Sequence, residues 1–181
     1  VSPDGRFALV HNGIIENADN LRAQLRAQGA VFTSETDTEV VVHLLAHAYD
    51  QAEPASYTGE VAGLSGTDEA VARRLVVAMR EVTAKLEGTF TLLALSTESP
   101  NVIVAARRSS PLVIGLGEGE NFLGSDVLAF IEHTNRAVEI GQDQLVVVSA
   151  SAVTIIGADG HPVPLKEYEV DFSADRATKG G

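Results

Sequence analysis

The sequence predicts one α+β domain in which helices come early in the chain and antiparallel strands come late. Apolar residues follow helical spacing across much of residues 17–86. From residue 89 onward they gather in short runs, separated by spacers rich in Gly, Ser, Asn and Asp that are typical of hairpins. A length of 181 residues, with 45% hydrophobic and 21% charged residues, suits one compact domain with a sizeable core. This order of elements favours helices layered on antiparallel sheets.

The first strand is expected at residues 7–11, FALVH, which form a short apolar run. The run stops at Asn12 and Gly13. Asn-Gly is the strongest two-residue signal for a hairpin turn, because both residues tolerate positive φ. The alternative is that the pair serves a chemical purpose at the end of a buried strand.

Two helices with a short strand between them are predicted next. The first helix begins at an Asn17 N-cap and ends at Gly29, which stands where a C-terminal glycine would. VFTS at residues 31–34 is expected to be a brief strand. Apolar residues at helical spacing predict the second helix over residues 38–49, with one buried face.

The remaining two thirds of the chain are predicted to hold a loop, a long helix and seven strands. Residues 51–66 lose periodicity and gather Pro, Gly, Ser and Ala, which predicts a surface loop. A third helix is expected from Thr67 to Leu86, with acidic residues at its positive end. A short helix at residues 126–133 interrupts the strands, and residues 173–181 are expected to form a flexible tail. The predicted strands are 89–96, 102–108, 111–117, 121–125, 136–141, 144–150 and 152–157.

The charge balance excludes several classes of partner. Thirteen Lys and Arg against 25 Asp and Glu give a net charge of −12, which is the wrong sign for neutralising phosphates or binding an anionic membrane. No apolar run approaches the roughly 20 residues of a spanning helix, and no signal peptide opens the chain. We therefore expect no nucleic acid partner, no membrane partner and a cytoplasmic location.

Cysteine is absent, which excludes disulfides, thiolate metal sites and a cysteine nucleophile within these residues. His43 and His47 share a helical face with Glu39 one turn earlier, which superficially resembles a metal-binding helix. The zincin pattern needs Glu directly after the first His, where Leu44 stands. We therefore expect an amphipathic helix with two partly exposed histidines, no metal and no cofactor.

Three further motifs are interpreted structurally. The glycines of residues 115–119 are flanked by acidic side chains that would repel phosphate, so they predict a hairpin turn. Serines at 109–110 and 125 lie in no GxSxG elbow, which disfavours a hydrolase triad. The arginines at 107–108 are expected to form ordinary ion pairs.

Asp37 lies between two threonines in SETDTEV, directly before the second helix. Two interpretations stay open here. The carboxylate could cap the N-terminus of that helix, or it could point into a pocket and hold a cationic amine.

Four segments together carry a family resemblance: HNGIIEN (11–17), SETDTEV (34–40), ARRSSPLVIGLGEGENFLGSD (106–126) and the closing KGG. In this order they resemble the glutaminase domain, a class II glutamine amidotransferase, of the glutamine:fructose-6-phosphate aminotransferase (isomerizing), or glucosamine-6-phosphate synthase, family. The resemblance implies an N-terminal-nucleophile hydrolase fold, an αββα sandwich of antiparallel sheets between helical layers. It also implies hydrolysis of glutamine to glutamate and ammonia for transfer to fructose 6-phosphate, giving glucosamine 6-phosphate.

The resemblance also implies the roles of particular residues. Asn12, through its side-chain NH2, and Gly13, through its backbone N–H, are expected to stabilise the oxyanion of the tetrahedral intermediate. Asp37 is expected to hold the α-ammonium group of glutamine. His11, Thr36 and Thr38 flank these positions, and supporting roles are expected for them.

The family's cysteine nucleophile belongs to an N-terminal segment that the matched motifs do not include. We therefore expect a domain that is incomplete at its N-terminus and inactive in isolation. The expected partners are that segment, a sugar-isomerase domain and other copies in a homo-oligomer. Two alternatives stay open: a non-catalytic remnant that binds glutamine or a protein, and another class II amidotransferase with a different acceptor.

Overall fold

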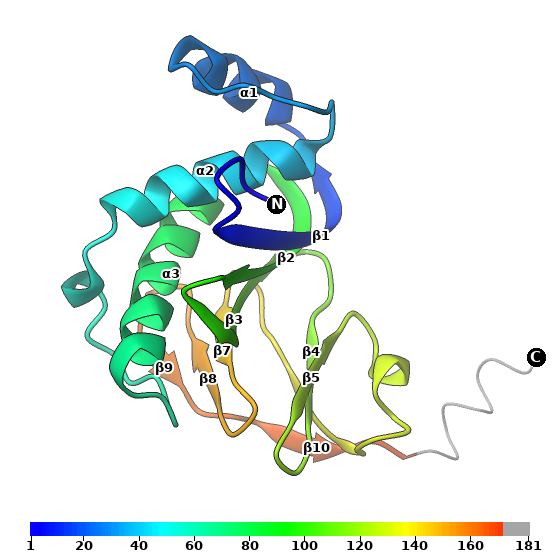
Figure 1. Cartoon of the computed structure of the whole chain (residues 1–181). Helices are drawn as coiled ribbons and strands as arrows, with labels where there is room; N and C mark the ends of the chain where they lie inside the picture. Colours follow the sequence, from blue (N-terminus) through cyan, green and yellow to red (C-terminus); the bar gives the residue numbers. More distant parts are fainter. Residues whose placement is uncertain (172–181) are drawn as a thin grey trace, which may run out of the picture.

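The structure, a computed structural model, describes residues 1–171 (Figure 1). It is an α+β fold with two antiparallel sheets, as the sequence predicts. The predicted tail at residues 173–181 and the closing KGG lie outside the described residues. None of the helices in residues 1–171 combines the length and the apolar character needed to cross a bilayer.

The elements follow the predicted order closely. The helices are α1 (Ala18–Ala27), α2 (Asp37–Gln51) and α3 (Gly66–Lys85), with 3-10 turns η1 (Pro54–Ser56) and η2 (Val127–Ala129). The strands are β1 (Phe7–Ile15), β2 (Gly88–Ser96), β3 (Ser99–Arg108), β4 (Val113–Leu116), β5 (Asn121–Gly124), β6 (Arg136–Glu139), β7 (Leu145–Val148), β8 (Val153–Ile156), β9 (Pro162–Val163) and β10 (Glu167–Glu169). All seven strands predicted after residue 88 are confirmed, and Gly29 ends α1 with a φ of 96°.

The strands do not form one meander of consecutive hairpins. One sheet has the order β1-β2-β3-β7-β8-β9, and the other has the order β10-β6-β4-β5. The chain leaves the first sheet after β3, builds β4 to β6 in the second, and returns at β7. Short local hairpins could be read from the sequence, but this change of sheet depends on contacts between distant residues.

Two short elements are predicted wrongly. Residues 31–34 are not a strand, because the backbone N–H groups of Thr33 and Ser34 bond to the carboxylate of Glu39 instead of to a neighbouring strand. Residues 126–133 form only the turn η2, because Phe130 is buried while Leu128 is 46% exposed, so no continuous helical face is buried. Strands β9 and β10 were too short to be predicted.

The hairpin interpretation of Asn12 and Gly13 is also wrong. Strand β1 continues through both residues to Ile15. Asn12 pairs with Thr91 and Gly13 with Phe90 on β2, in an unbroken antiparallel register. The two residues therefore lie inside a strand, so a hairpin turn does not account for the Asn-Gly pair.

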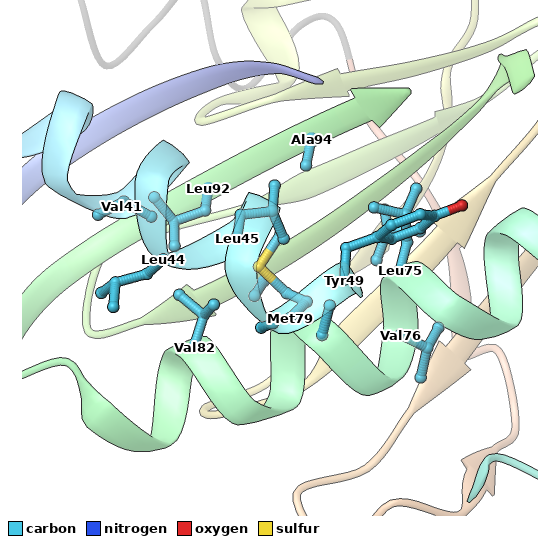
Figure 2. Packing of buried hydrophobic residues seen from close by; sticks show 14 of the residues in the cluster. Val41, Leu44, Leu45, Tyr49, Leu75, Val76, Met79, Val82, Leu92 and Ala94 are labelled. Atoms are coloured by element: carbon cyan, nitrogen blue, oxygen red, sulfur yellow. The ribbon is translucent and has the colours of Figure 1, made fainter. Parts of the chain in front are cut away.

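Helices cover one face of the sandwich in the described residues. Helices α2 and α3 pack against the six-stranded sheet, and their buried side chains meet those of β2 (Figure 2). On the outer face of the four-stranded sheet, Val113 and Ala137 are covered by Phe130 and Val127 of the η2 segment. The second helical layer of the expected αββα sandwich is thus absent from residues 1–171, because η2 is too short to form one.

Two separate cores hold these layers together. The larger lies between the helices and the six-stranded sheet and includes the fully buried Leu45, Leu75, Met79 and Leu92 (Figure 2). The smaller lies between the two sheets, around Ala105, Ile114 and Val146. Strand β1 is at the edge of the six-stranded sheet, so its outer edge, the side away from β2, faces no other strand among the described residues.

Candidate functional site

Asp37 brings helix α2 into contact with β1 on both sides of Asn12 and Gly13. Its Oδ2 accepts the backbone N–H of Ile15 at 2.9 Å. Its Oδ1 lies 3.5 Å from Nδ1 of His11. Residues that are far apart in the sequence therefore meet at the outer edge of β1, and the Asp37 side chain keeps 28% of its surface exposed there.

The N-cap of α2 is Thr36, not Asp37. The Thr36 side chain accepts the backbone N–H of Glu39 at 3.3 Å, while Asp37 is the first residue of the helix. The capping interpretation of Asp37 is therefore wrong. A carboxylate at this position still benefits from the positive end of the helix dipole.

Glu39 fixes the segment that leads into α2. Its carboxylate accepts the N–H groups of Thr33 and Ser34, each at 2.7 Å, and both of their hydroxyls. Burial alone would raise the pKa of Glu39, but these hydrogen bonds from Ser34 and Thr33 outweigh it and lower the pKa to about 2.

Replacing Glu39 with glutamine is expected to destabilise the fold by about 2 kcal/mol at pH 7, because one amide oxygen cannot replace two carboxylate oxygens. The folded pKa lies below the ordinary 4.5. The contribution of the carboxylate is therefore complete above pH 4.5 and is lost as the pH falls toward about 2. Urea denaturation at pH 7 and pH 3 should show the gap between wild type and variant narrowing at pH 3.

Glu35→Gln is the matched control, since the Glu35 side chain is 88% exposed in the same segment. It should leave the stability at both pH values nearly unchanged. A gap for Glu39→Gln that is as wide at pH 3 as at pH 7 would contradict the assigned role of the carboxylate.

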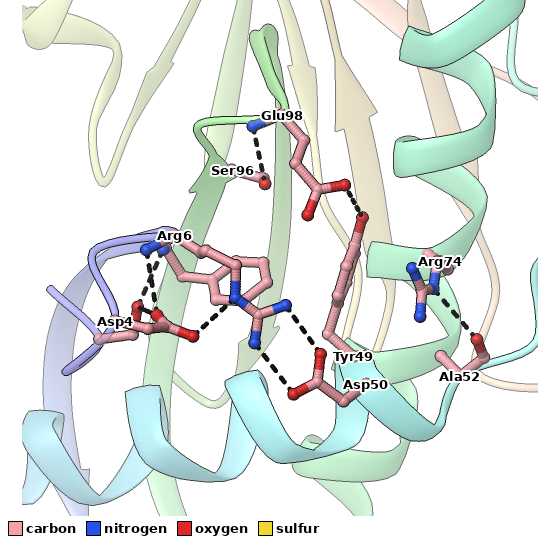
Figure 3. Close-up of polar contacts among 10 residues, drawn as sticks. Asp4, Arg6, Tyr49, Asp50, Ala52, Arg74, Ser96 and Glu98 are labelled. Atoms are coloured by element: carbon pink, nitrogen blue, oxygen red, sulfur yellow. Dashed lines mark hydrogen bonds and ion pairs between the residues drawn. The ribbon is translucent and has the colours of Figure 1, made fainter.

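The other end of α2 is also tied to β1 (Figure 3). Arg6, just before β1, donates to both carboxylate oxygens of Asp50 at 2.7 and 2.9 Å and to Asp4 at 2.6 Å. The Tyr49 hydroxyl donates to Glu98 at 3.2 Å, just beyond β2. Because both ends of α2 are held against the sheet, the position of Asp37 relative to β1 is well defined.

Gly13 occupies a position that only glycine fits. Its φ is 123°, and a Cβ atom there would lie 2.0 Å from the carbonyl oxygen of Thr89. Phe7 and Ile15 both donate their N–H groups away from β2, to Ser2 and Asp37. Residues two apart in a paired strand direct their N–H groups to the same side. We infer that the N–H of Gly13 also faces the outer edge of β1.

The side chain of Asn12 lies on the face of β1 that looks toward the second sheet. It is exposed, and its Nδ2 donates to the hydroxyl of Ser125 at 3.4 Å, just after β5. A cavity of about 160 Å³ opens beside it, between the two sheets. Its lining residues are Val10, Asn12, Thr91, Leu93, Leu112, Leu123, Gly124 and Ser125.

The contact between Asn12 and Ser125 was missed by the sequence interpretation. The two residues are 113 positions apart, and no local pattern connects them. Ser125 belongs to one of the motifs that carry the family resemblance, but that motif does not predict that its hydroxyl lies next to the Asn12 amide.

The sequence predicts two partly exposed histidines on α2, and this prediction is wrong for His43. His43 is buried against the ring of Phe32, with 4.4 Å between ring centroids, whereas His47 is exposed. Phe32 belongs to the segment before α2, so helical spacing alone could not predict this burial. Within residues 1–171, no group of three metal-ligating side chains could hold a metal ion.

The remaining motifs have structural roles. Arg108 pairs with Asp143 at 2.6 Å, and Arg107 donates to the carbonyl of Ile140 at 2.9 Å. The predicted ion pair is thus confirmed for Arg108. The glycine-rich stretch at residues 117–120 is the hairpin turn between β4 and β5.

Comparisons with known proteins agree with the motifs at this edge. Residues 1–64, which include Asn12, Gly13 and Asp37, match a family model described as a glutamine amidotransferase domain. The chain is 49% identical over 178 residues to a glutamine–fructose-6-phosphate aminotransferase (isomerizing) of Leifsonia xyli, and 49% identical over 177 residues to that of Streptomyces coelicolor. These matches cover 98% of this chain and 26% of each relative, so the chain spans about a quarter of the length of its curated relatives.

A solved structure supports the fold. The chain is similar to the glutamine phosphoribosylpyrophosphate amidotransferase of Bacillus subtilis in complex with ADP and GMP, with a TM-score of 0.56. The match covers 95% of this chain and 30% of the other, at 22% sequence identity. This likeness concerns the fold alone.

Proposed function

The chain belongs to the family of glutamine amidotransferase domains found in glutamine–fructose-6-phosphate aminotransferases, and from this premise we propose that the outer edge of β1 binds glutamine for hydrolysis. The observation that carries the proposal is the contact of Asp37 with both Ile15 and His11, on either side of Asn12 and Gly13. The proposed oxyanion donors thus lie on β1 between the two residues that contact the proposed anion for the substrate amine.

The proposed chemistry is acyl transfer through a thioester. A cysteine thiolate attacks the side-chain amide carbon of glutamine, the leaving nitrogen takes a proton and departs as ammonia, and water then releases glutamate. The 181 residues contain no cysteine, so the thiol has to come from polypeptide outside them. In this proposal the isolated chain supplies the oxyanion donors and the anchor but no activity.

Each of the three residues has a role that its chemistry suits. The Asn12 amide is a neutral donor that cannot be lost by titration, and Gly13 lacks the Cβ that would keep a backbone N–H away from the reacting atoms. Asp37 carries the negative charge that a cationic amine needs. Its N–H partner Ile15 leaves other lone pairs of the carboxylate available.

The finer proposal concerns the fate of the ammonia. Identities of 48–49% to glutamine–fructose-6-phosphate aminotransferases favour transfer to fructose 6-phosphate, giving glucosamine 6-phosphate. The phosphoribosylpyrophosphate alternative has only a fold likeness at 22% identity. A sugar-isomerase domain, a homo-oligomeric parent and a cytoplasmic location remain predictions that belong to this proposal.

Replacing Asp37 with asparagine in the full-length protein should raise KM for glutamine about 30-fold, the equivalent of roughly 2 kcal/mol, with a smaller change in kcat. The asparagine oxygen can still accept the N–H of Ile15, so the helix remains anchored. Steady-state measurement of glutamate release tests this. Asp19→Asn, at an exposed position in α1, is the matched control. An unchanged KM for Asp37→Asn would exclude Asp37 as the anchor.

A further inference from the structure

His11 is buried directly beside the proposed oxyanion donors. Its side chain is 2% exposed. Phe7 and Ile15, which lie at odd-numbered positions of β1 like His11, belong to the core between the sheet and the helices. Since alternate side chains of a strand share a face, the His11 ring points toward α2.

The polar contacts of this ring all involve the first two residues of α2. Nδ1 lies 3.1 Å from Oγ1 of Thr38 and 3.5 Å from Oδ1 of Asp37. An ionised carboxylate can only accept hydrogen bonds, so the contact with Asp37 needs the proton on Nδ1. Nε2 is buried and has no hydrogen-bond partner among the described residues.

An unpaired buried nitrogen costs stability, so an apolar side chain would serve better if His11 only filled space. What the imidazole adds is a donor aimed at the N-terminus of α2. The Asp37 carboxylate then has a neighbour at each oxygen: Oδ2 accepts the N–H of Ile15 at 2.9 Å, and Oδ1 lies 3.5 Å from Nδ1 of His11. Contacts at both oxygens restrict the rotation of the carboxylate, and a carboxylate with restricted rotation binds a cation with less loss of entropy.

We propose that His11 is a positioning residue that orients the Asp37 carboxylate to receive the α-ammonium group of glutamine. This inference rests on the proposed function of the outer edge of β1. It implies that His11 contributes to selection of substrates that carry the α-amine, although the ring itself does not touch the substrate.

The test compares glutamine with 4-carbamoylbutanoate, which is glutamine without its α-amino group, in the full-length protein. His11→Ala should raise KM for glutamine about tenfold and leave kcat within about twofold. KM for 4-carbamoylbutanoate should stay unchanged, because that compound has no ammonium group and so makes no contact with Asp37 that the variant could weaken. His11→Asn, whose amide can still donate toward Asp37, should recover part of the lost affinity. His47→Ala is the matched control, since His47 is exposed on the same helix.

The outcomes separate the inference from the function on which it rests. Equal losses for both substrates would show a general structural defect and overturn the positioning role. If Asp37→Asn removes the discrimination between the two substrates while His11→Ala and His11→Asn both retain it, the inference fails and the proposed function stands. If Asp37→Asn also leaves the discrimination intact, the proposed anchor itself fails. Should His11→Ala not fold, His11→Leu fills the same space without a ring nitrogen and is expected to lower the discrimination in the same direction.

Discussion

Replacing Asn12 with alanine in the full-length protein should lower kcat for glutamine hydrolysis about 100- to 1,000-fold, which corresponds to roughly 3–4 kcal/mol. The oxyanion forms only as the tetrahedral intermediate is approached. Loss of the donor therefore destabilises the transition state more than the bound substrate. KM should change little. Steady-state and single-turnover measurements of glutamate release would separate the chemical step from binding.

Ser125→Ala is the matched control for this variant. Asn12 donates to the Ser125 hydroxyl at 3.4 Å, and alanine at 125 removes that contact without removing the amide. We expect Ser125→Ala to keep kcat within a few-fold of wild type. If it lost activity as severely as Asn12→Ala, the effect would lie in the contact between the two sheets, and the oxyanion role would be refuted.

Replacing Gly13 with alanine should have the largest effect on the fold itself. The added Cβ would lie 2.0 Å from the carbonyl oxygen of Thr89 and 2.9 Å from the Cα of Phe90, and a φ of 123° is itself unfavourable for alanine. Because both neighbours are backbone atoms, β1 and β2 must move apart. We expect a loss of roughly 3 kcal/mol or more, a drop in melting temperature of about 10 °C, and activity below detection.

Gly119→Ala separates the cost of a positive φ from the cost of the steric clash with β2. Gly119 also has a positive φ, of 71°, but a Cβ there would meet nothing within 4 Å. This control should cost only about 1 kcal/mol in thermal or urea denaturation. Equal melting temperatures for the two variants would mean that the close approach of β1 and β2 at Gly13 does not matter.

Local patterns predicted most of the elements correctly. The helices α1 to α3 and strands β2 to β8 follow from apolar spacing, which is a property of neighbouring residues. The errors at residues 31–34 and 126–133 have a different origin. In each case a side-chain contact that apolar spacing does not reveal decided the conformation. At residues 31–34 it is the Glu39 carboxylate, five and six positions along the chain, and at residues 126–133 it is the burial of Phe130 over the second sheet.

The sequence names candidate residues for the site but does not give their geometry. Asn12, Gly13 and Asp37 could be named because two short motifs resemble those of the family, and the resemblance implies their roles. The residues alone could not decide whether the Asp37 carboxylate caps the helix or holds the substrate amine. That assignment depends on its contacts with Ile15 and His11, which are 22 and 26 positions earlier in the chain.

The sequence by itself determined the class of fold, the order of elements and the family, because motifs and apolar periodicity are properties of neighbouring residues. The three residues expected to act on glutamine follow from that family resemblance. Only the tertiary structure decided that Asn12 and Gly13 lie inside a strand, that the late strands divide between two sheets, and that His11 faces Asp37. These features depend on pairing between distant segments. The free energy that stabilises such pairing comes from burial and hydrogen bonds, which patterns of neighbouring residues do not predict.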